Sequence, residues 1–401
     1  MKIIKRRERG LTLIELMVSM GLGLLIVLAL LTVLTNVNRS NLELSGSNRV
    51  IENGRFALQL LQTDVSHAGY WGGHVPQFDD LTLQATSTPA DTPTAVPDPC
   101  VAYSPVGWTP AYTNNVVGMA VQGTDVPSPV PSPVTPFCST VVTNPHPSTD
   151  VLVVRNLEPC LAGAGTGDCS DTRALASPHL YLQVSRCGTE TTRTKFGTDT
   201  FTLKAGDCAA LAPVRRFSSS LYYVRSFAVT AGDGIPTLMR ARFGVGGTGT
   251  GTAGNAPEFT AAQALVEGVE GFRVEYGLDN LSDSGATVDL AALGAAINWQ
   301  STAILNTPVN RGNGLPDSYV RCSQATPCTA DQLVNVTAVK LYVLVRAEST
   351  SPGHTDTKKY CLASKCTVDA DYLGPFNDGY KRHLFRQTVR LTNVAMRRET
   401  S

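Results

Sequence analysis

The most informative chemical group in this chain is a single carboxylate, Glu15, in an otherwise uncharged run of residues 11–38. A carboxylate near the edge of a membrane span costs a few kcal/mol or more, so a chain retains one there for a use. The cost falls when an opposite charge neutralises it in the hydrocarbon. The position of Glu15 therefore predicts an ion pair within or beside a membrane.

A short basic leader precedes this run. Residues 1–10 end in Gly10 and carry five basic residues against one acidic residue. An ordinary secretory signal would be cleaved after the apolar run at a small-x-small site, and residues 34–40 offer none. A plain membrane anchor would leave Glu15 as an unexplained cost. Neither alternative accounts for leader, glycine and carboxylate together.

Ten cysteines offer a second kind of chemistry, and all of them follow the apolar run. An even number of cysteines in an oxidising compartment favours disulfides. Pairing between sequence neighbours is the simplest expectation: Cys160–Cys169, Cys187–Cys208, Cys322–Cys328 and Cys361–Cys366, which leaves Cys100 with Cys138. Sequence alone does not prove this connectivity. A metal site is the alternative, because His354 and His383 flank Cys361 and Cys366, but the spacing of these cysteines is not that of a zinc site.

No motif for catalysis is present. The chain lacks Gly-x-Ser-x-Gly, His-Glu-x-x-His, Ser-x-x-Lys and a phosphate-binding loop. Residues 279–289 partly resemble a calcium loop, but Leu281 occupies a ligand position and no bidentate Glu follows, so an ordinary polar turn is favoured. We therefore expect no enzymatic activity, no cofactor and no metal.

Charge argues against a nucleic-acid partner. Lys plus Arg and Asp plus Glu both number 33, whereas nucleic-acid binding depends on a basic surface. Basic residues do gather near the C-terminus: Lys381, Arg382, Arg386, Arg390, Arg397 and Arg398. They could contact a polyanion, but the favoured interpretation is the solvated face of a last strand and a charged tail.

The element that positions Glu15 is a long helix. Residues 11–34 would form a helix roughly 36 Å long at about 1.5 Å per residue, which is enough to cross a bilayer. The basic leader should stay in the cytoplasm, so everything after about residue 36 is exported. An amphipathic continuation follows, with Ile51, Leu58, Leu61 and Val65 on one stripe, and it should end near Gly69. This stripe needs a partner surface, and a sheet is the natural one.

Strand signals recur after the helix. Residues 150–155 form a short apolar run, and five further segments follow, several alternating with period two: 180–184, 221–229, 272–276, 339–346 and 385–391. Alternation gives one buried and one wet face, which suits antiparallel sheets. Residues 85–99 and 126–147 are Pro-rich and 244–254 Gly-rich, so we expect loops there. The predicted fold class is α+β.

At its N-terminus the chain resembles a type IV prepilin. The shared pattern is a short basic leader, a Gly, an apolar or aromatic residue, Thr-Leu-Ile-Glu-Leu and then an apolar helix. The resemblance implies that a prepilin peptidase cleaves after Gly10 and methylates the new terminus, Leu11, where the family more often has Phe. It implies that Glu15 pairs with the N-terminal amine of a neighbouring subunit. It also implies a pilin-like fold, with an enlarged, loop-rich, disulfide-containing head.

Further stretches are similar to the PilW type of minor pilin. They are residues 53–64, Ala68-Gly-Tyr-Trp-Gly72, residues 266–279, and the last strands at 339–348 and 385–393. Family members often carry Cys where this chain has Gly73, which puts a family disulfide there in doubt. The segments expected are the leader (1–10), the membrane half of the helix (11–36), its amphipathic half (37–66) and the exported head (67–401).

The resemblance implies a minor pilin that primes pilus assembly and sits at or near the tip. Its partners would be the peptidase, other minor pilins, the major pilin and an inner-membrane assembly platform, with no nucleic acid. The protein would span the inner membrane once, with a periplasmic head, and reach the pilus tip after assembly. A type II secretion pseudopilin and a tip adhesin remain alternatives, and twitching motility, adhesion and DNA uptake are not distinguished.

Overall fold

The structure is a computed structural model, and it describes residues 12–79, 89–131, 138–162, 179–244, 256–281 and 312–398. The chain divides into two compact units, one ending at Arg49 and one beginning at Val50. The long helix α1 (Leu13–His67) contributes to both units. We describe each unit by itself.

The first unit is the apolar part of α1. From Leu13 to beyond Val37 its side chains are exposed, although nearly all are apolar. In the described part of the chain, α1 is the helix that is long and apolar enough to cross a membrane, with a mean hydropathy of 2.6 over its best window. An all-round apolar helix of this kind is stable in lipid because its backbone groups are bonded internally.

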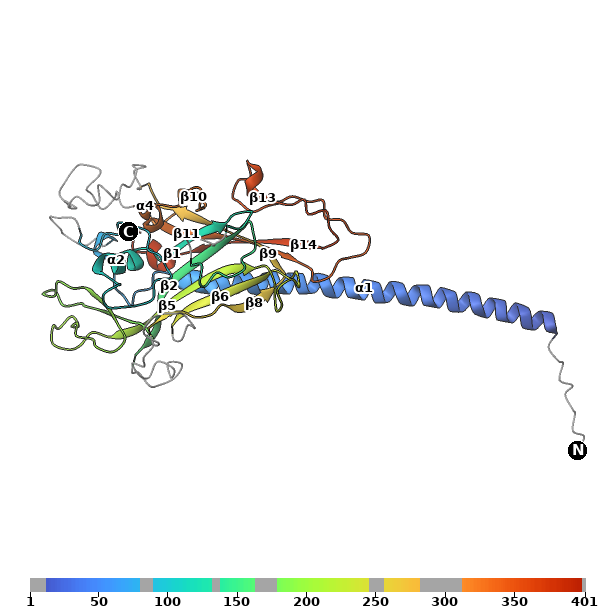
Figure 1. Ribbon diagram of the computed structural model, residues 1–401, viewed down its shortest axis with the longest axis horizontal. Helices are drawn as coiled ribbons and strands as arrows, with labels where there is room; N and C mark the ends of the chain where they lie inside the picture. The colour runs from blue at the N-terminus through green and yellow to red at the C-terminus, as the bar shows by residue number, and fades with distance from the viewer. Residues whose placement is uncertain are drawn as a thin grey trace, which may run out of the picture. The chain divides into compact units, whose positions relative to one another are not determined.

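The second unit is built on two antiparallel sheets, in agreement with the α+β prediction. The larger sheet has eight strands among the described residues: β1 (Val121–Val126), β2 (Thr149–Leu161), β5 (Val214–Arg225), β3 (Tyr181–Val184), β4 (Thr194–Gly197), β6 (Thr237–Gly244), β7 (Glu258–Phe259) and β8 (Gln263–Glu267). The long strand β5 is central to this sheet, with β2 and β6 beside it (Figure 1). Strand β3 also pairs with β5.

The smaller sheet has the strand order β10 (Ser318–Val320), β9 (Val269–Leu278), β11 (Val336–Arg346) and β14 (Arg382–Arg390). A two-stranded ribbon, β12 (Tyr360–Cys361) with β13 (Tyr372–Leu373), lies in the connection from β11 to β14. The short helices and turns are η1 (Gln77–Asp79), α2 (Pro110–Gly118), α4 (Ala330–Val334), η5 (Asp369–Asp371) and α5 (Thr392–Ala395).

The main core lies between the sheets and the second half of α1. It gathers α1 side chains with alternate residues of β2, β9 and β11. The other face of the larger sheet carries a second, aromatic-rich core that includes α2. Strand β2 therefore buries both faces, with Leu152 and Val154 in one core and Val151 and Val153 in the other. This explains why residues 150–154 are nearly continuous in apolar character rather than alternating.

Strand β9 corrects the expectation of a wet face. All ten of its residues are buried, including Arg273 and Glu275 on the face away from the main core. The connection 347–381 covers that face: the Ser364 amide donates to Glu275 at 3.0 Å, and Arg273 donates to the Ala370 carbonyl. The charged residues that produce the alternation are thus bonded beneath a loop rather than solvated.

Candidate assembly site

The described chain begins with a helix cap that includes Glu15. Thr12 directly precedes α1, and its hydroxyl accepts a hydrogen bond from the Glu15 amide at 3.3 Å. The carboxylate in turn accepts from the Thr12 amide at 3.0 Å and from its hydroxyl at 2.9 Å, all at Oε2. This reciprocal arrangement is a capping box, which satisfies amides that the first helical turn leaves without partners.

The cap holds the carboxylate at the N-terminal end of α1. Negative charge is favourable there because the helix dipole places partial positive charge at that end. The structure thus holds the Glu15 carboxylate beside Thr12, the residue that precedes the helix. Gly10 and Leu11 lie outside the described residues, so the cleavage site and the ion pair of Glu15 stay predictions.

The second half of α1 carries a buried stripe of small and apolar residues: Val50, Gly54, Ala57, Leu58, Leu61 and Val65. Three of the four predicted apolar positions belong to it, and Ile51 does not, because 38% of its side chain is exposed. Val50 takes that place on the helix face. The glycine has a packing reason, since a Cβ on Gly54 would lie 2.0 Å from a ring carbon of Phe385 on β14.

The helix ends where the sequence predicts, and the segment after it joins several elements. Gly69 has a φ of +73°, which favours glycine, and its amide donates to the Arg155 carbonyl of β2 at 2.9 Å. Trp71 is almost fully buried and stacks on Phe217 of β5. The Ala68–Gly72 motif thus connects the end of α1 to the larger sheet.

Four disulfides are formed between described residues, in the pairs that sequence proximity suggests: Cys100–Cys138, Cys187–Cys208, Cys322–Cys328 and Cys361–Cys366. Cys160 is also disulfide-bonded. Its expected partner, Cys169, lies outside the described residues, so that pairing stays a prediction.

The disulfides close loops that connect elements of the head. Next to Cys322, Arg321 pairs with Asp150 of β2 at 2.5 Å, and the Gln324 amide donates to Asp125 of β1 at 2.7 Å. The segment at the start of the Cys322–Cys328 loop therefore joins the end of β10 in the smaller sheet to β1 and β2 of the larger sheet. Burial raises the pKa of the Asp150 carboxyl, which Arg321 partly offsets.

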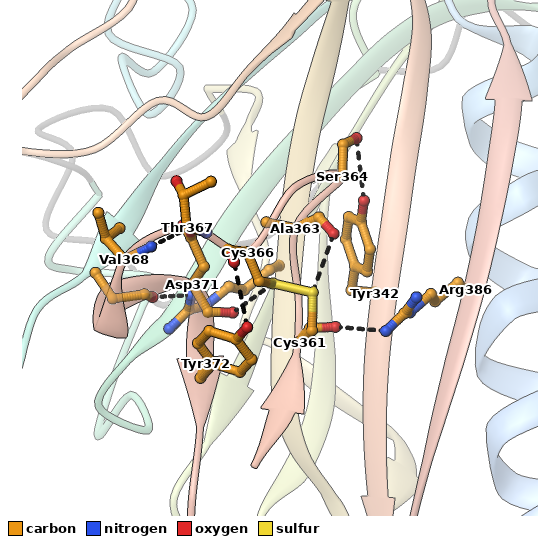
Figure 2. The surroundings of a disulfide bond; sticks show 12 residues. Tyr342, Cys361, Ala363, Ser364, Cys366, Thr367, Val368, Asp371, Tyr372 and Arg386 are labelled. Carbon is orange, nitrogen blue, oxygen red and sulfur yellow. Dashed lines mark hydrogen bonds between the residues drawn. A yellow bond between two sulfur atoms is a disulfide. The ribbon is translucent and has the colours of Figure 1, made fainter.

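The Cys361–Cys366 disulfide lies in the connection that covers β9 and β11 (Figure 2). Arg386 of β14 donates to the Cys361 carbonyl at 2.9 Å, and the Tyr372 hydroxyl donates to the Cys366 carbonyl at 3.2 Å. The Asp371 carboxylate accepts from the amide of Thr367 at 3.0 Å. The backbone of both cysteines is therefore hydrogen-bonded to other parts of the head, and the disulfide stabilises the loop that covers the smaller sheet.

Three of the basic residues near the C-terminus correct a second expectation, whereas Arg386 and Arg390 of β14 are exposed, as a solvated strand face predicts. Arg382 is fully buried, although a solvated strand face was predicted for it. It pairs with Glu270 at 2.5 Å, Asp378 at 2.6 Å and Asp356 at 3.0 Å. Burial disfavours the charged guanidinium, but these three carboxylates together raise the pKa of Arg382 above its usual value.

Arg397 and Arg398 are likewise buried rather than part of a solvated tail. Both pair with Asp79, Arg397 at 3.3 Å and Arg398 at 3.2 Å. Arg398 also donates to the side chain of Asn335 at 2.7 Å and to the Asp279 carbonyl. These residues bond inside the head, so they do not form a free basic surface.

Metal-binding groups are not found in the part of the chain that the structure describes: no cluster of three or more His, Cys, Asp or Glu there could hold an ion. Asp279, the first residue of the calcium-like segment, instead accepts the amides of Gly314 at 2.8 Å and Asn313 at 3.1 Å. Residues 282–289 of that segment lie outside the described residues.

Two family models match the chain. The model for a type IV pilus-assembly protein W matches residues 221–393, and the model for the prokaryotic N-terminal methylation motif matches residues 5–31. The chain thus carries a prepilin-type methylation motif at its N-terminus and a PilW-like region over residues 221–393. The first match runs from β5 to α5 and contains the whole smaller sheet, and the second contains Gly10, Leu11 and Glu15.

Among solved structures, this PilW-type chain is similar to a type IV-like pilin from Thermus thermophilus. The identity is 13%, the match covers 86% of this chain and 98% of that chain, and the TM-score is 0.30. The similarity to the PilW type therefore rests on the two family models. No curated protein matches the PilW-type chain.

Proposed function

We propose that this PilW-type prepilin is a low-abundance subunit that primes assembly of a type IV pilus and occupies its tip. The observation that carries the proposal is the isolated carboxylate, Glu15, capping the start of an uncharged, exposed apolar helix. A charge in that place is stabilised when a neighbouring subunit supplies an amine. The terminal amine of another mature pilin is the amine that the prepilin signal would create.

The size of the head supports a place at the end of the filament. The second unit runs from Val50 to the C-terminus and contains both sheets. Shaft subunits have neighbours above and below, and a head of this size would obstruct one set of them. A tip position removes that set. Before assembly, the protein would span the inner membrane with this head in the periplasm.

The test replaces Glu15 by leucine in a cell that lacks the native gene. The Glu15→Leu protein should be processed and inserted, because the apolar side chain enters lipid more easily. It should be depleted from sheared pili, and pilus number should fall, because breaking a buried pair costs about 3–5 kcal/mol.

The matched control is Glu43→Leu, which removes a carboxylate from the same helix beyond the uncharged run, where Glu43 pairs with Arg39 at 3.7 Å. That variant should assemble normally. Normal recovery of the Glu15→Leu protein in sheared pili, with a normal number of pili, would refute the assembly role.

A further inference from the structure

The head contains a cleft that its assembly role does not use. Its volume is about 620 Å³, within the range of about 300–1,000 Å³ that is typical of small-molecule sites. The described residues that line it come from α2, from strand β4 with the turns on either side, and from the segments around Phe78, Asp91 and Trp108. All of these belong to the second unit.

The floor of the cleft is aromatic. Trp108 makes edge-to-face contacts with Tyr103 and Phe196, at ring-centroid distances of 5.5 and 5.2 Å. The polar atoms of the floor are bonded inward: the Tyr103 hydroxyl donates to the Phe196 carbonyl at 3.1 Å, and the Trp108 indole donates to the Val101 carbonyl at 3.3 Å. These three aromatic residues are only 6–8% exposed, so the floor offers a ligand a small apolar surface rather than donors.

The rim is polar, rich in hydroxyl groups and balanced in charge. Six threonines line it: Thr113, Thr191, Thr192, Thr194, Thr198 and Thr200. Two cations, Arg193 and Lys195, stand against two carboxylates, Asp91 and Asp199. A polyanion would need an excess of cations, which this rim lacks.

Two of the disulfides between described residues enclose the wall segments of the cleft in sequence. Cys100–Cys138 encloses residues 103–108, and Cys187–Cys208 encloses residues 191–200. Arg193 on the rim donates to the Cys187 carbonyl at 2.8 Å, which fixes the rim to the second disulfide. A site whose walls are fixed in advance loses less conformational entropy when a ligand binds.

We propose that this cleft binds an uncharged saccharide. Hydroxyl and amide groups around the rim can exchange hydrogen bonds with sugar hydroxyls, since each threonine hydroxyl both donates and accepts. The aromatic floor suits the apolar face of a sugar ring, and the balanced rim charge favours a neutral ligand over an anionic one. The proposal does not depend on the position of the protein in a filament.

The experiment uses the full chain in lauryldimethylamine oxide, a detergent without a sugar headgroup. The probes are three neutral trisaccharides (maltotriose, cellotriose and triacetylchitotriose) and one anionic sugar, 3′-sialyllactose. Saturation-transfer NMR detects binding, and titration gives the Kd. At least one neutral trisaccharide should bind saturably, and 3′-sialyllactose should bind more weakly or not at all.

Three variants locate the binding. Thr198→Trp should fill the cleft and abolish binding, whereas Thr357→Trp, the same change at an exposed threonine outside the lining, should leave the Kd unchanged. Thr192→Val removes a single rim hydroxyl with little change in shape, and it should weaken binding roughly 3- to 10-fold, because that hydroxyl exchanges a hydrogen bond with the sugar in the proposed site.

Three results would overturn the proposal: no binding by any neutral trisaccharide, stronger binding of 3′-sialyllactose than of every neutral probe, or binding that Thr198→Trp leaves intact. Intact disulfides and an unchanged unfolding temperature of the Thr198→Trp protein exclude misfolding as the cause of a loss. If that variant does not fold, the Thr192→Val titration decides, and an unchanged Kd then counts against the cleft.

Discussion

At the residue scale, the proposed function rests on the carboxylate of Glu15, which an opposite charge would stabilise at the edge of an apolar span. Glu15 takes part in the cap of α1 and at the same time lies at the edge of an uncharged span. The cap uses Thr12, the residue that would follow the new terminus after cleavage at Gly10. The cap therefore ties the position of the carboxylate to the residue adjoining the predicted terminal amine.

Cleavage should produce a mature protein that starts at N-methylated Leu11. The reason is that Gly10 lets a peptidase approach the backbone closely, so a bulky Gly10→Leu variant should keep its leader. Terminal mass spectrometry of membrane-purified protein measures both. The control is Gly21→Leu, at a helical glycine with no heavy atom within 4 Å of an added Cβ. A wild-type start at Met1, or beyond residue 34, would contradict the prepilin signal.

Asp233 should make the stability of the head sensitive to acid. Hydrogen bonds from the amides of Ile235, Val229 and their neighbours lower the pKa of its carboxyl to about 2 from an ordinary 3.8. A group with a lowered folded-state pKa stabilises the fold above its unfolded pKa and loses that contribution as pH falls toward the folded value. The contribution of Asp233 is therefore complete above about pH 4 and lost toward about pH 2.

The Asp233→Asn protein should have a flatter acid limb in a plot of unfolding temperature against pH. The wild type should lose more stability than this variant over that pH range, while Asp199→Asn, at an exposed carboxylate, should follow the wild type. If the wild type and Asp233→Asn lose unfolding temperature equally as pH falls, the amide hydrogen bonds to the Asp233 carboxylate do not cause the acid sensitivity.

At the scale of elements, the sequence identifies periodic segments well and their environment less well. The period of the apolar residues predicts the long helix, its end near Gly69 and the main strands. It places the buried stripe at Ile51 instead of Val50, because two adjacent apolar residues fit the same pattern. The alternation also predicts one solvent-exposed face for β9. That prediction is wrong, because the loop that buries Arg273 and Glu275 leaves no signal in the local sequence.

The helix α2 was missed within the loop-rich region, although the sequence contains a signal for it. Thr109 caps the helix by accepting from the Tyr112 amide, and Pro110 occupies the first turn. A Thr-Pro pair at a helix start is a recognised combination, since proline lacks an amide that would need a partner there. The neighbouring Pro-rich segments conceal it, and the cleft that α2 lines was not predicted.

The close approach of α1 to β14 should make Gly54 intolerant of a side chain. A Cβ there would overlap the Phe385 ring, so Gly54→Ala should destabilise the head by roughly 1–3 kcal/mol as the packing is forced apart. Gly46→Ala is the matched control, because nothing lies within 4 Å of its added Cβ. It should be neutral or slightly stabilising, as alanine favours a helix over glycine.

Chemical denaturation of the two full-length variants measures both effects. A Gly54→Ala protein as stable as Gly46→Ala would mean that Phe385 can rotate away at little cost, and the glycine would then need another explanation. The double variant Gly54→Ala/Phe385→Ala lacks the ring that the added Cβ would overlap. If the overlap causes the loss, this double variant should recover part of the stability lost by Gly54→Ala.

For the whole molecule, long-range ion pairs close the head in a way that no local pattern reveals. Arg398 joins Asp79, Asp279 and Asn335, which are separated by at least 63 residues from it in the chain. The sequence shows only a basic C-terminus, and the natural interpretation of that composition is a solvated tail. The burial of Arg398 therefore corrects the expectation of a solvated tail, while Arg386 and Arg390 on β14 are exposed.

The head thus has its own core and closes its own ion pairs, whereas the apolar half of α1 is exposed along its length in the first unit. We propose that lipid covers that half before assembly and that other pilins cover it afterwards, since exposed apolar surface of this extent is not stable in water. Such a subunit would leave the membrane only as neighbouring helices replace the lipid. A priming role would require it to be present before the shaft grows.

The tip role predicts few copies per filament, because a filament has one growing tip. Deleting the gene should sharply reduce the number of pili without changing the diameter of those that remain, since the shaft would consist of the major subunit in either case. Electron microscopy measures both properties. Quantitative proteomics of sheared pili gives the sharper result: the ratio of this protein to the major pilin should fall as pili lengthen. A constant ratio, or a copy number comparable to that of the major pilin, would place the protein along the shaft and contradict the tip role.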